Sequence, residues 1–189
     1  MKKLFILFFA ITTIGANAQN DFAPIGAKWH YYSEDYSSGW QSIYILESIG
    51  DTVIKAKTCK ILRETDILKV PDVAKIDTTI SSNVRYVYYE NNKVFWFKYN
   101  NFYKLYDFDA KVGDSWEVPF EVKCGYQSNG DSLGNVLVEK IDTMTINGQM
   151  LRRIYLNKTT DSKVNIPIVA IEHIGSMGNI FPVCSLLLA

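Results

Sequence analysis

The stretch Asn135–Leu156 reads NVLVEKIDTMTINGQMLRRIYL and decides the fold class. Two strand-like runs, Asn135–Ile146 and Gln149–Leu156, are separated by Asn147-Gly148. Asn and Gly tolerate the positive φ of a two-residue type I′ turn, so this pair predicts a tight β-hairpin. Asn91-Asn92 joins two further apolar runs in the same way. Both turns predict antiparallel neighbouring strands.

Strand-like runs cover the rest of the chain, and none sustains the 3.6-residue period of a helix. The composition agrees, because 12 Tyr, 10 Phe and 4 Trp favour strands. Residues 64–82 have mixed polarity and contain Pro71, so we expect a long excursion there, with room for a short edge strand. The predicted strands are Lys28–Tyr32, Gln41–Ile49, Thr58–Arg63, Val84–Glu90, Lys93–Lys98, Phe102–Phe108, Ser115–Gln127, Asn135–Ile146, Gln149–Leu156 and Val164–Ile174.

The two halves of the chain resemble each other. Phe22–Trp29 (FAPIGAKW) shares its Phe, its aliphatic-Gly pair and its Gly-x-x-Trp spacing with Phe108–Trp116 (FDAKVGDSW). Glu47–Ile54 then resembles Glu139–Ile146 in the same order. The pattern predicts a duplicated β unit, with repeats 22–100 and 108–185, although chance likeness between two β meanders is the alternative. We expect one all-β domain at 19–189, an antiparallel, strongly curved sheet of barrel-like or sandwich form.

The first residues predict export. Lys2 and Lys3 precede the apolar run Leu4–Ile14, and Ala16-Asn17-Ala18 supplies a small-x-small cleavage site. We therefore expect a signal peptide at 1–18, cut between Ala18 and Gln19, and a secreted or periplasmic protein. The run is shorter than the ~20 residues of a membrane anchor, so we expect no membrane insertion after cleavage.

Charge and cysteine content narrow the classes of partner. Residues 19–189 carry 18 basic and 20 acidic side chains, a net charge of −2 that does not predict nucleic acid as a partner.

Three cysteines permit at most one internal disulfide. Cys124 and Cys184 lie in turn-rich sequence, so we favour a bridge between them. Cys59 lies in an apolar strand pattern and is expected to be a core residue.

No motif predicts a catalytic or metal site. His30 and His173 lack the spacing of a metal pair, and the acids Asp107, Asp109 and Asp114 lack that of a calcium loop, so we expect exposed turn acids. The sequence predicts neither a cofactor nor a catalytic residue.

Aromatic side chains are the one surplus that a binding site could use. Stacked on one face of a sheet, these rings could receive sugars or peptides. Tyr36 and Trp40 are the best candidate binding residues, because they flank the polar stretch Ser37-Ser38-Gly39.

Several of these segments together resemble a known group. The signal peptide, residues 106–108 with 113–116, the hairpin at 146–148 and residues 171–176 are similar to uncharacterised secreted proteins of Bacteroidetes-type bacteria, over nearly the whole of 19–189. Many of those proteins carry a C-terminal domain for type IX secretion, which we expect either to be absent here or to have been cut off. Gly often stands in the group where this chain has His173. The resemblance implies an exported β module without an assigned activity.

The sequence thus favours a non-enzymatic module in the cell envelope or outside it. We expect it to bind a glycan, a peptide or an envelope component, or to serve as a structural unit. The alternative is an extracellular hydrolase of polysaccharide or peptide. Its paired carboxylates would come from Glu47, Glu139 and Glu172, at the separation of roughly 5–10 Å that glycosidases use.

Overall fold

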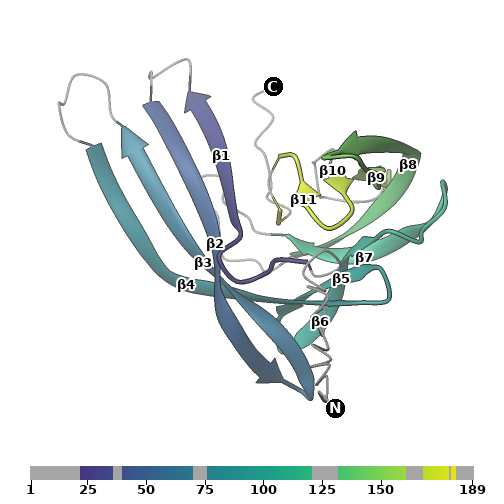
Figure 1. Ribbon diagram of the computed structural model, residues 1–189, viewed down its shortest axis with the longest axis horizontal. Helices are drawn as coiled ribbons and strands as arrows, with labels where there is room; N and C mark the ends of the chain where they lie inside the picture. Colours follow the sequence, from purple (N-terminus) through teal and green to yellow (C-terminus); the bar gives the residue numbers. More distant parts are fainter. Residues whose placement is uncertain are drawn as a thin grey trace, which may run out of the picture.

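The computed structural model describes residues 22–35, 40–69, 76–120, 132–160, 168–178, 180 and 181. In these residues the chain forms two antiparallel, strongly curled half-barrel sheets of six and five strands (Figure 1). This confirms the all-β, antiparallel, strongly curved fold. The first sheet contains β1 (Lys28–Asp35), β2 (Trp40–Ile54), β3 (Lys57–Lys69), β4 (Ile76–Glu90), β5 (Lys93–Lys98) and β6 (Asn101–Asp107). The second contains β7 (Ser115–Phe120), β8 (Ser132–Ile146), β9 (Gln149–Lys158), β10 (Ile168–Ile171) and β11 (Gly175–Ser176).

Each sheet is a meander in which strands pair in chain order, so sequence neighbours are also spatial neighbours. Figure 1 shows β1–β4 rising on one side of the molecule and β8–β11 curling on the other, with β5–β7 between them. The chain crosses from one sheet to the other through the turn at 108–114.

The excursion expected at residues 64–82 is wrong. β3 continues to Lys69 and β4 begins at Ile76, and these two residues are paired in register. A β-bulge between Arg63 and Thr65 shifts the register at the start of this extension. Backbone hydrogen bonds carry a ladder regardless of side-chain polarity, which explains why mixed polarity concealed two long strands.

The predicted hairpin turns are confirmed. Asn91 and Asn92 have φ of 51° and 56°, and Asn147 and Gly148 have φ of 51° and 80°. Two more turns have the same backbone without these favourable residue pairs: Lys55-Ala56 (47° and 62°) and Tyr99-Asn100 (51° and 58°). A left-handed backbone costs a residue with a Cβ about 1–2 kcal/mol, so the Lys55-Ala56 turn is strained.

The two sheets share an unusual detail at corresponding places. The Gly26 amide donates to Ser48 O over 2.8 Å, and the Gly113 amide donates to Val138 O over 2.9 Å. A β-bulge follows in each case, at Ser48/Gly50 and at Val138/Lys140. Ser48 thus corresponds to Val138 in the structure. The likeness between Glu47–Ile54 and Glu139–Ile146 matches Ser48 to Lys140 instead, two residues further on. These contacts support the duplicated unit, which stays a prediction.

The hairpin beyond the bulge is longer in the second sheet. Ile54, the last residue before the turn, lies six positions after Ser48, and Ile146 lies eight positions after Val138. The extra length is even, so the alternation of the two faces is preserved.

One hydrophobic core joins the two sheets. Residues from both form a single buried cluster that includes Leu46, Tyr106, Val138 and Ile154. The Trp29 indole of β1 donates to Ile174 O over 2.7 Å, and the Phe22 ring stacks on Trp29 with centroids 6.1 Å apart. The two half-barrels are therefore one packing unit.

The last described residues complete that core. Ile180 and Phe181 are buried, and the Tyr106 hydroxyl donates to Ile180 O. The Phe181 ring lies 4.7 Å from the ring of Trp96 in β5. The chain after β11 thus packs against the first sheet.

Cys59 is free and buried, as its apolar strand pattern predicts. Cys124 and Cys184 lie outside the described residues, so their pairing stays a prediction. None of the described residues forms a helix long and apolar enough to cross a membrane.

Candidate functional site

The two candidate binding residues lie at the junction of β1 and β2. Tyr36 falls outside the described residues, and Trp40 begins β2 opposite Asp35, with its side chain outside the described part. Their role in binding stays a prediction.

The three carboxylates of the hydrolase alternative are each engaged locally. Glu47 in β2 pairs with Lys28 at 3.0 Å and with Arg63 at 2.6 Å, and these bonds lower the pKa of Glu47. Glu139 accepts a hydrogen bond from Asn157. Glu172 accepts one from the Arg152 amide at 3.0 Å. Among the described residues, no hydrogen bond or ion pair joins two of these carboxylates, and each of them has a partner of its own.

The outer side of β4–β6 carries a group of aromatic rings. Tyr86 pairs with Phe97, Tyr88 with Phe95, and Phe97 with Phe102, so these five side chains share one face of the sheet. Alternate residues such as Val87, Val94 and Trp96 point to the other face and enter the core. We call Tyr86, Tyr88, Phe95, Phe97 and Phe102 the outer aromatic face.

The rings of this face contact one another closely. Tyr88 stacks on Phe95 with centroids 4.6 Å apart and planes 8° from parallel. Phe102 meets Tyr88 edge-on at 4.7 Å and Phe97 at 5.0 Å. Tyr88 is buried and lies outside the main core cluster, and burial raises the pKa of its hydroxyl. The other four rings are partly exposed. The result is a partly exposed surface of closely packed aromatic rings.

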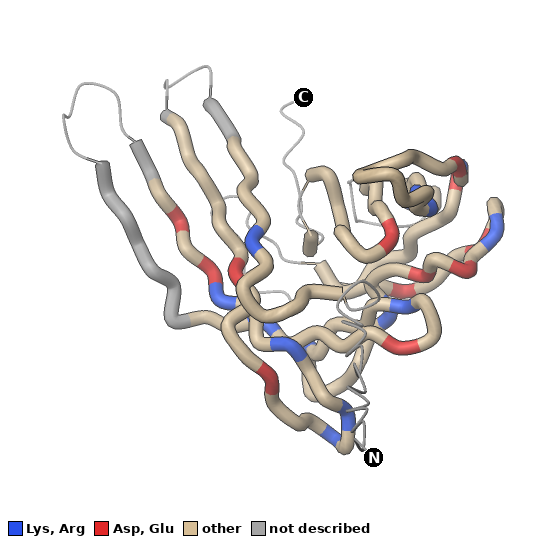
Figure 2. Tube along the Cα trace, viewed as in Figure 1, with Lys and Arg blue, Asp and Glu red and all other residues tan. Residues whose placement is uncertain are grey.

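Lysines border the outer aromatic face at the β2–β3 hairpin. Lys57 lies 5.4 Å from the Tyr88 ring centroid and pairs with Glu90 at 2.7 Å, which raises the pKa of Lys57. Lys55 lies 5.9 Å from the Phe97 centroid, and its ammonium donates to Asn100 O. Figure 2 shows this basic hairpin tip at the lower end of the first sheet. Cations above ring faces are attracted to the ring quadrupole, so the lysines are held in place.

The inner side of the first sheet holds a buried ion pair. Arg85 and Glu64 are both buried and pair directly, and the Tyr44 hydroxyl donates to Glu64 over 2.8 Å. Burial raises the pKa of Tyr44. The Arg85 guanidinium lies 4.4 Å from the Phe181 ring centroid. Both charges have partners within the protein. Because Arg85 also contacts the Phe181 ring, this network binds the last described residues to the sheet.

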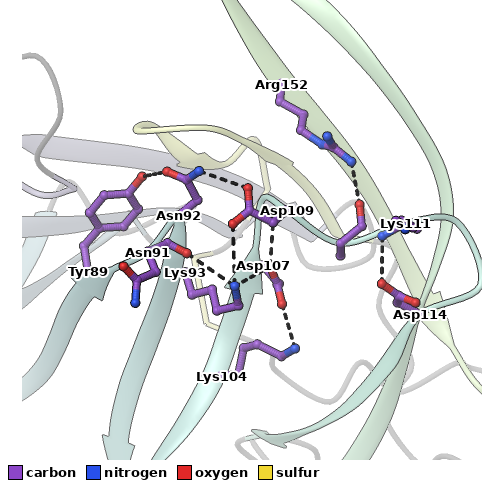
Figure 3. A network of polar contacts seen from close by, with 11 residues as sticks. Tyr89, Asn91, Asn92, Lys93, Lys104, Asp107, Asp109, Lys111, Asp114 and Arg152 are labelled. Atoms are coloured by element: carbon purple, nitrogen blue, oxygen red, sulfur yellow. Dashed lines mark hydrogen bonds and ion pairs between the residues drawn. The ribbon is translucent and has the colours of Figure 1, made fainter.

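A second polar network connects the two sheets (Figure 3). Asp107 pairs with Lys104 at 2.8 Å and with Lys93 at 3.4 Å. Asn92 donates to Asp109 over 2.9 Å, and the Arg152 guanidinium of β9 donates to Ala110 O. The network holds the crossing between the sheets in one conformation.

The acids of this crossing differ from the expected exposed turn acids at one position. Asp109 and Asp114 are exposed, but Asp107 is only 6% exposed. Its place at the end of β6 turns it inward between Lys93 and Lys104, which the spacing of the three acids does not reveal.

The two histidines lie in different elements of the fold, His30 in β1 and His173 in the turn after β10. His30 is exposed in β1. His173 has a left-handed φ of 62° and meets the Tyr89 ring at 5.9 Å. Within the described residues no three His, Cys, Asp or Glu side chains come together as metal ligands.

Sequence reasoning placed the candidate binding residues at Tyr36 and Trp40 and missed the outer aromatic face. A signal for two residues of this face exists in Lys93–Lys98, which reads KVFWFK. Alternation puts Phe95 and Phe97 on one face and Val94 and Trp96 on the other. Lys55 has no comparable signal, because its contact with Asn100 depends on how two separate hairpins meet.

Comparison of the chain with protein-family models, with curated proteins and with solved structures gives no match.

Proposed function

We propose that the chain is an exported, non-enzymatic β module that binds a glycan on the outer aromatic face. The observation that carries the proposal is the set of four partly exposed rings fixed around Tyr88. Rings of this kind offer a large apolar contact area at small cost in side-chain entropy, and flat sugar rings present C–H groups that match such a surface.

The same face suits a glycan better than an extended peptide. A peptide that adds to a sheet needs an open strand edge with free backbone groups. The outer aromatic face presents side chains, and four of its five rings lie on β4 and β5, which have hydrogen-bonded strands on either side. Phe102 alone lies on β6, the last strand of the sheet. Lys55 and Lys57 add polar donors at its border.

The test is a glycan array probed with the purified chain 19–189. Phe97→Leu keeps an apolar side chain but removes a ring. We expect it to weaken binding by about two- to thirteenfold, because one ring contact contributes about 0.5–1.5 kcal/mol. Tyr32→Leu is the matched control, because Tyr32 is a 60% exposed aromatic residue of β1. We expect its binding to equal that of the parent.

Two outcomes would contradict this placement. Unchanged glycan binding by Phe97→Leu and Phe102→Leu would show that the glycan does not bind on the outer aromatic face. Loss of binding in Tyr36→Leu or Trp40→Leu, with Phe97→Leu unaffected, would place the site at the β1–β2 junction instead. Circular dichroism of each variant shows that the fold is retained.

A further inference from the structure

The turn beside the outer aromatic face is built from unfavourable residues. Lys55 and Ala56 both have a left-handed backbone, with φ of 47° and 62°. The corresponding turn of the second sheet uses Asn147 and Gly148, which adopt this backbone readily. Strained residues persist where the surroundings hold them and concentrate at ligand sites. Lys55 therefore occupies the β2–β3 turn although its left-handed backbone conformation is energetically unfavourable.

The strained turn positions the side chain of Lys55 at the surface. It lies exposed above the partly exposed Phe97 ring and donates to Asn100 O in the β5–β6 turn. That second turn is also left-handed, with φ of 51° at Tyr99 and 58° at Asn100. Two strained hairpin tips thus meet at the border of the outer aromatic face and place an ammonium group next to a ring.

The charge of this border is positive. The neighbouring acids already have partners: Glu90 pairs with Lys57 at 2.7 Å, and Asp51 pairs with Lys60 at 3.1 Å. Within the described part of the chain, the contacts of Lys55 are a backbone carbonyl and a ring, neither of which carries a negative charge. A ligand with an anionic group fits here by charge complementarity.

We infer that the ligand of the outer aromatic face is an acidic polysaccharide of the uronate class. A sugar ring lies on Phe97, and its carboxylate is bound by the Lys55 ammonium. The inference rests on the proposed function and adds the charge of the ligand to it. The adjoining rings and cation match a repeating unit that is both a flat sugar and an acid. An acidic peptide or an anionic lipid surface supplies the charge without the sugar.

The test compares polygalacturonate with its methyl ester, which has the same backbone without the charge. We expect the parent chain to bind polygalacturonate at least tenfold more tightly, with an affinity that falls as salt is raised from 50 to 300 mM. The double variant Lys55→Asn/Ala56→Gly copies the turn of the second sheet. We expect it to lose the preference for the acid while its melting temperature stays equal or rises. Lys158→Asn, an exposed lysine at the end of β9, is the control and keeps the preference.

The outcomes separate the two proposals. Equal binding of polygalacturonate and its ester, or an unchanged preference in Lys55→Asn/Ala56→Gly, overturns the acidic class and leaves glycan binding intact. Binding of poly-glutamate, or of vesicles that contain phosphatidylglycerol, as tightly as polygalacturonate also overturns it. A chain that binds no member of the glycan array and neither polymer overturns both proposals.

Discussion

Asp107 is a buried carboxylate whose environment keeps it charged. Burial alone would raise its pKa, but the hydrogen bond from Lys104 and the nearby Lys93 outweigh this effect and lower it. The folded-state pKa thus lies below the unfolded value of about 3.9. The charged form stabilises the fold above that value, and this contribution disappears as the pH falls through the lower, folded-state pKa.

Replacement of this carboxylate gives a prediction with a defined pH dependence. We expect Asp107→Asn to lower the free energy of unfolding by roughly 2 kcal/mol at pH 7, because two charge-assisted contacts are lost. The difference from the parent should shrink below about pH 4. Urea titrations at pH 7 and pH 3 measure both values. Asp109→Asn, at an exposed position, is the control, and an effect there as large as at Asp107 would contradict the account.

Single residues also show where sequence reasoning succeeds and where it stops. The burial of Cys59 follows from its strand pattern alone. The burial of Asp107 does not, because it depends on Lys93 and Lys104 in two paired strands. Lys55 is similar, since its partner Asn100 belongs to another hairpin. The local pattern predicts which face of the sheet a side chain is on, but not which residues it contacts there.

Among the elements, the β2–β3 hairpin has a strained turn. Ala56 has a φ of 62°, a region that Gly enters without cost. We expect Ala56→Gly alone to raise the free energy of unfolding by about 1 kcal/mol. Gly148→Ala at the corresponding turn of the second sheet should lower it by a similar amount. Thermal unfolding of both variants checks the pair, and a destabilised Ala56→Gly would show that the turn is not strained.

Most strands could be predicted, apart from the extensions of β3 and β4 over residues 64–69 and 76–82, but the division into two sheets could not. Every antiparallel pair signalled by a tight turn is present. The break between β6 and β7 falls at a turn that resembles the one before β1, so nothing local marks it. Contacts such as that of Trp29 with Ile174 determine how the strands divide into two sheets, and these two residues lie 145 positions apart in the sequence.

At the scale of the whole molecule, one core makes the two sheets interdependent. Phe181 is buried between Arg85 and Trp96, and Ile180 is held by Tyr106. We expect Phe181→Ala to lower the free energy of unfolding by about 3–5 kcal/mol. Hydrogen exchange should show β3–β4 and β8–β9 losing protection together. Loss confined to the first sheet would mean that the half-barrels are separate folding units.

The outer aromatic face belongs to the same scale, because residues from β4, β5 and β6 build it. It lies outside the shared core, so its four partly exposed rings are available to a ligand without unfolding either sheet. The central claim is that a glycan binds there. Aromatic ¹³C NMR spectra of the chain 19–189, recorded during titration with polygalacturonate, test it most directly. The account predicts shifts at Phe95, Phe97 and Phe102 and none at Tyr32 or Phe22; shifts confined to other rings, or no shifts with any glycan that binds, would contradict it.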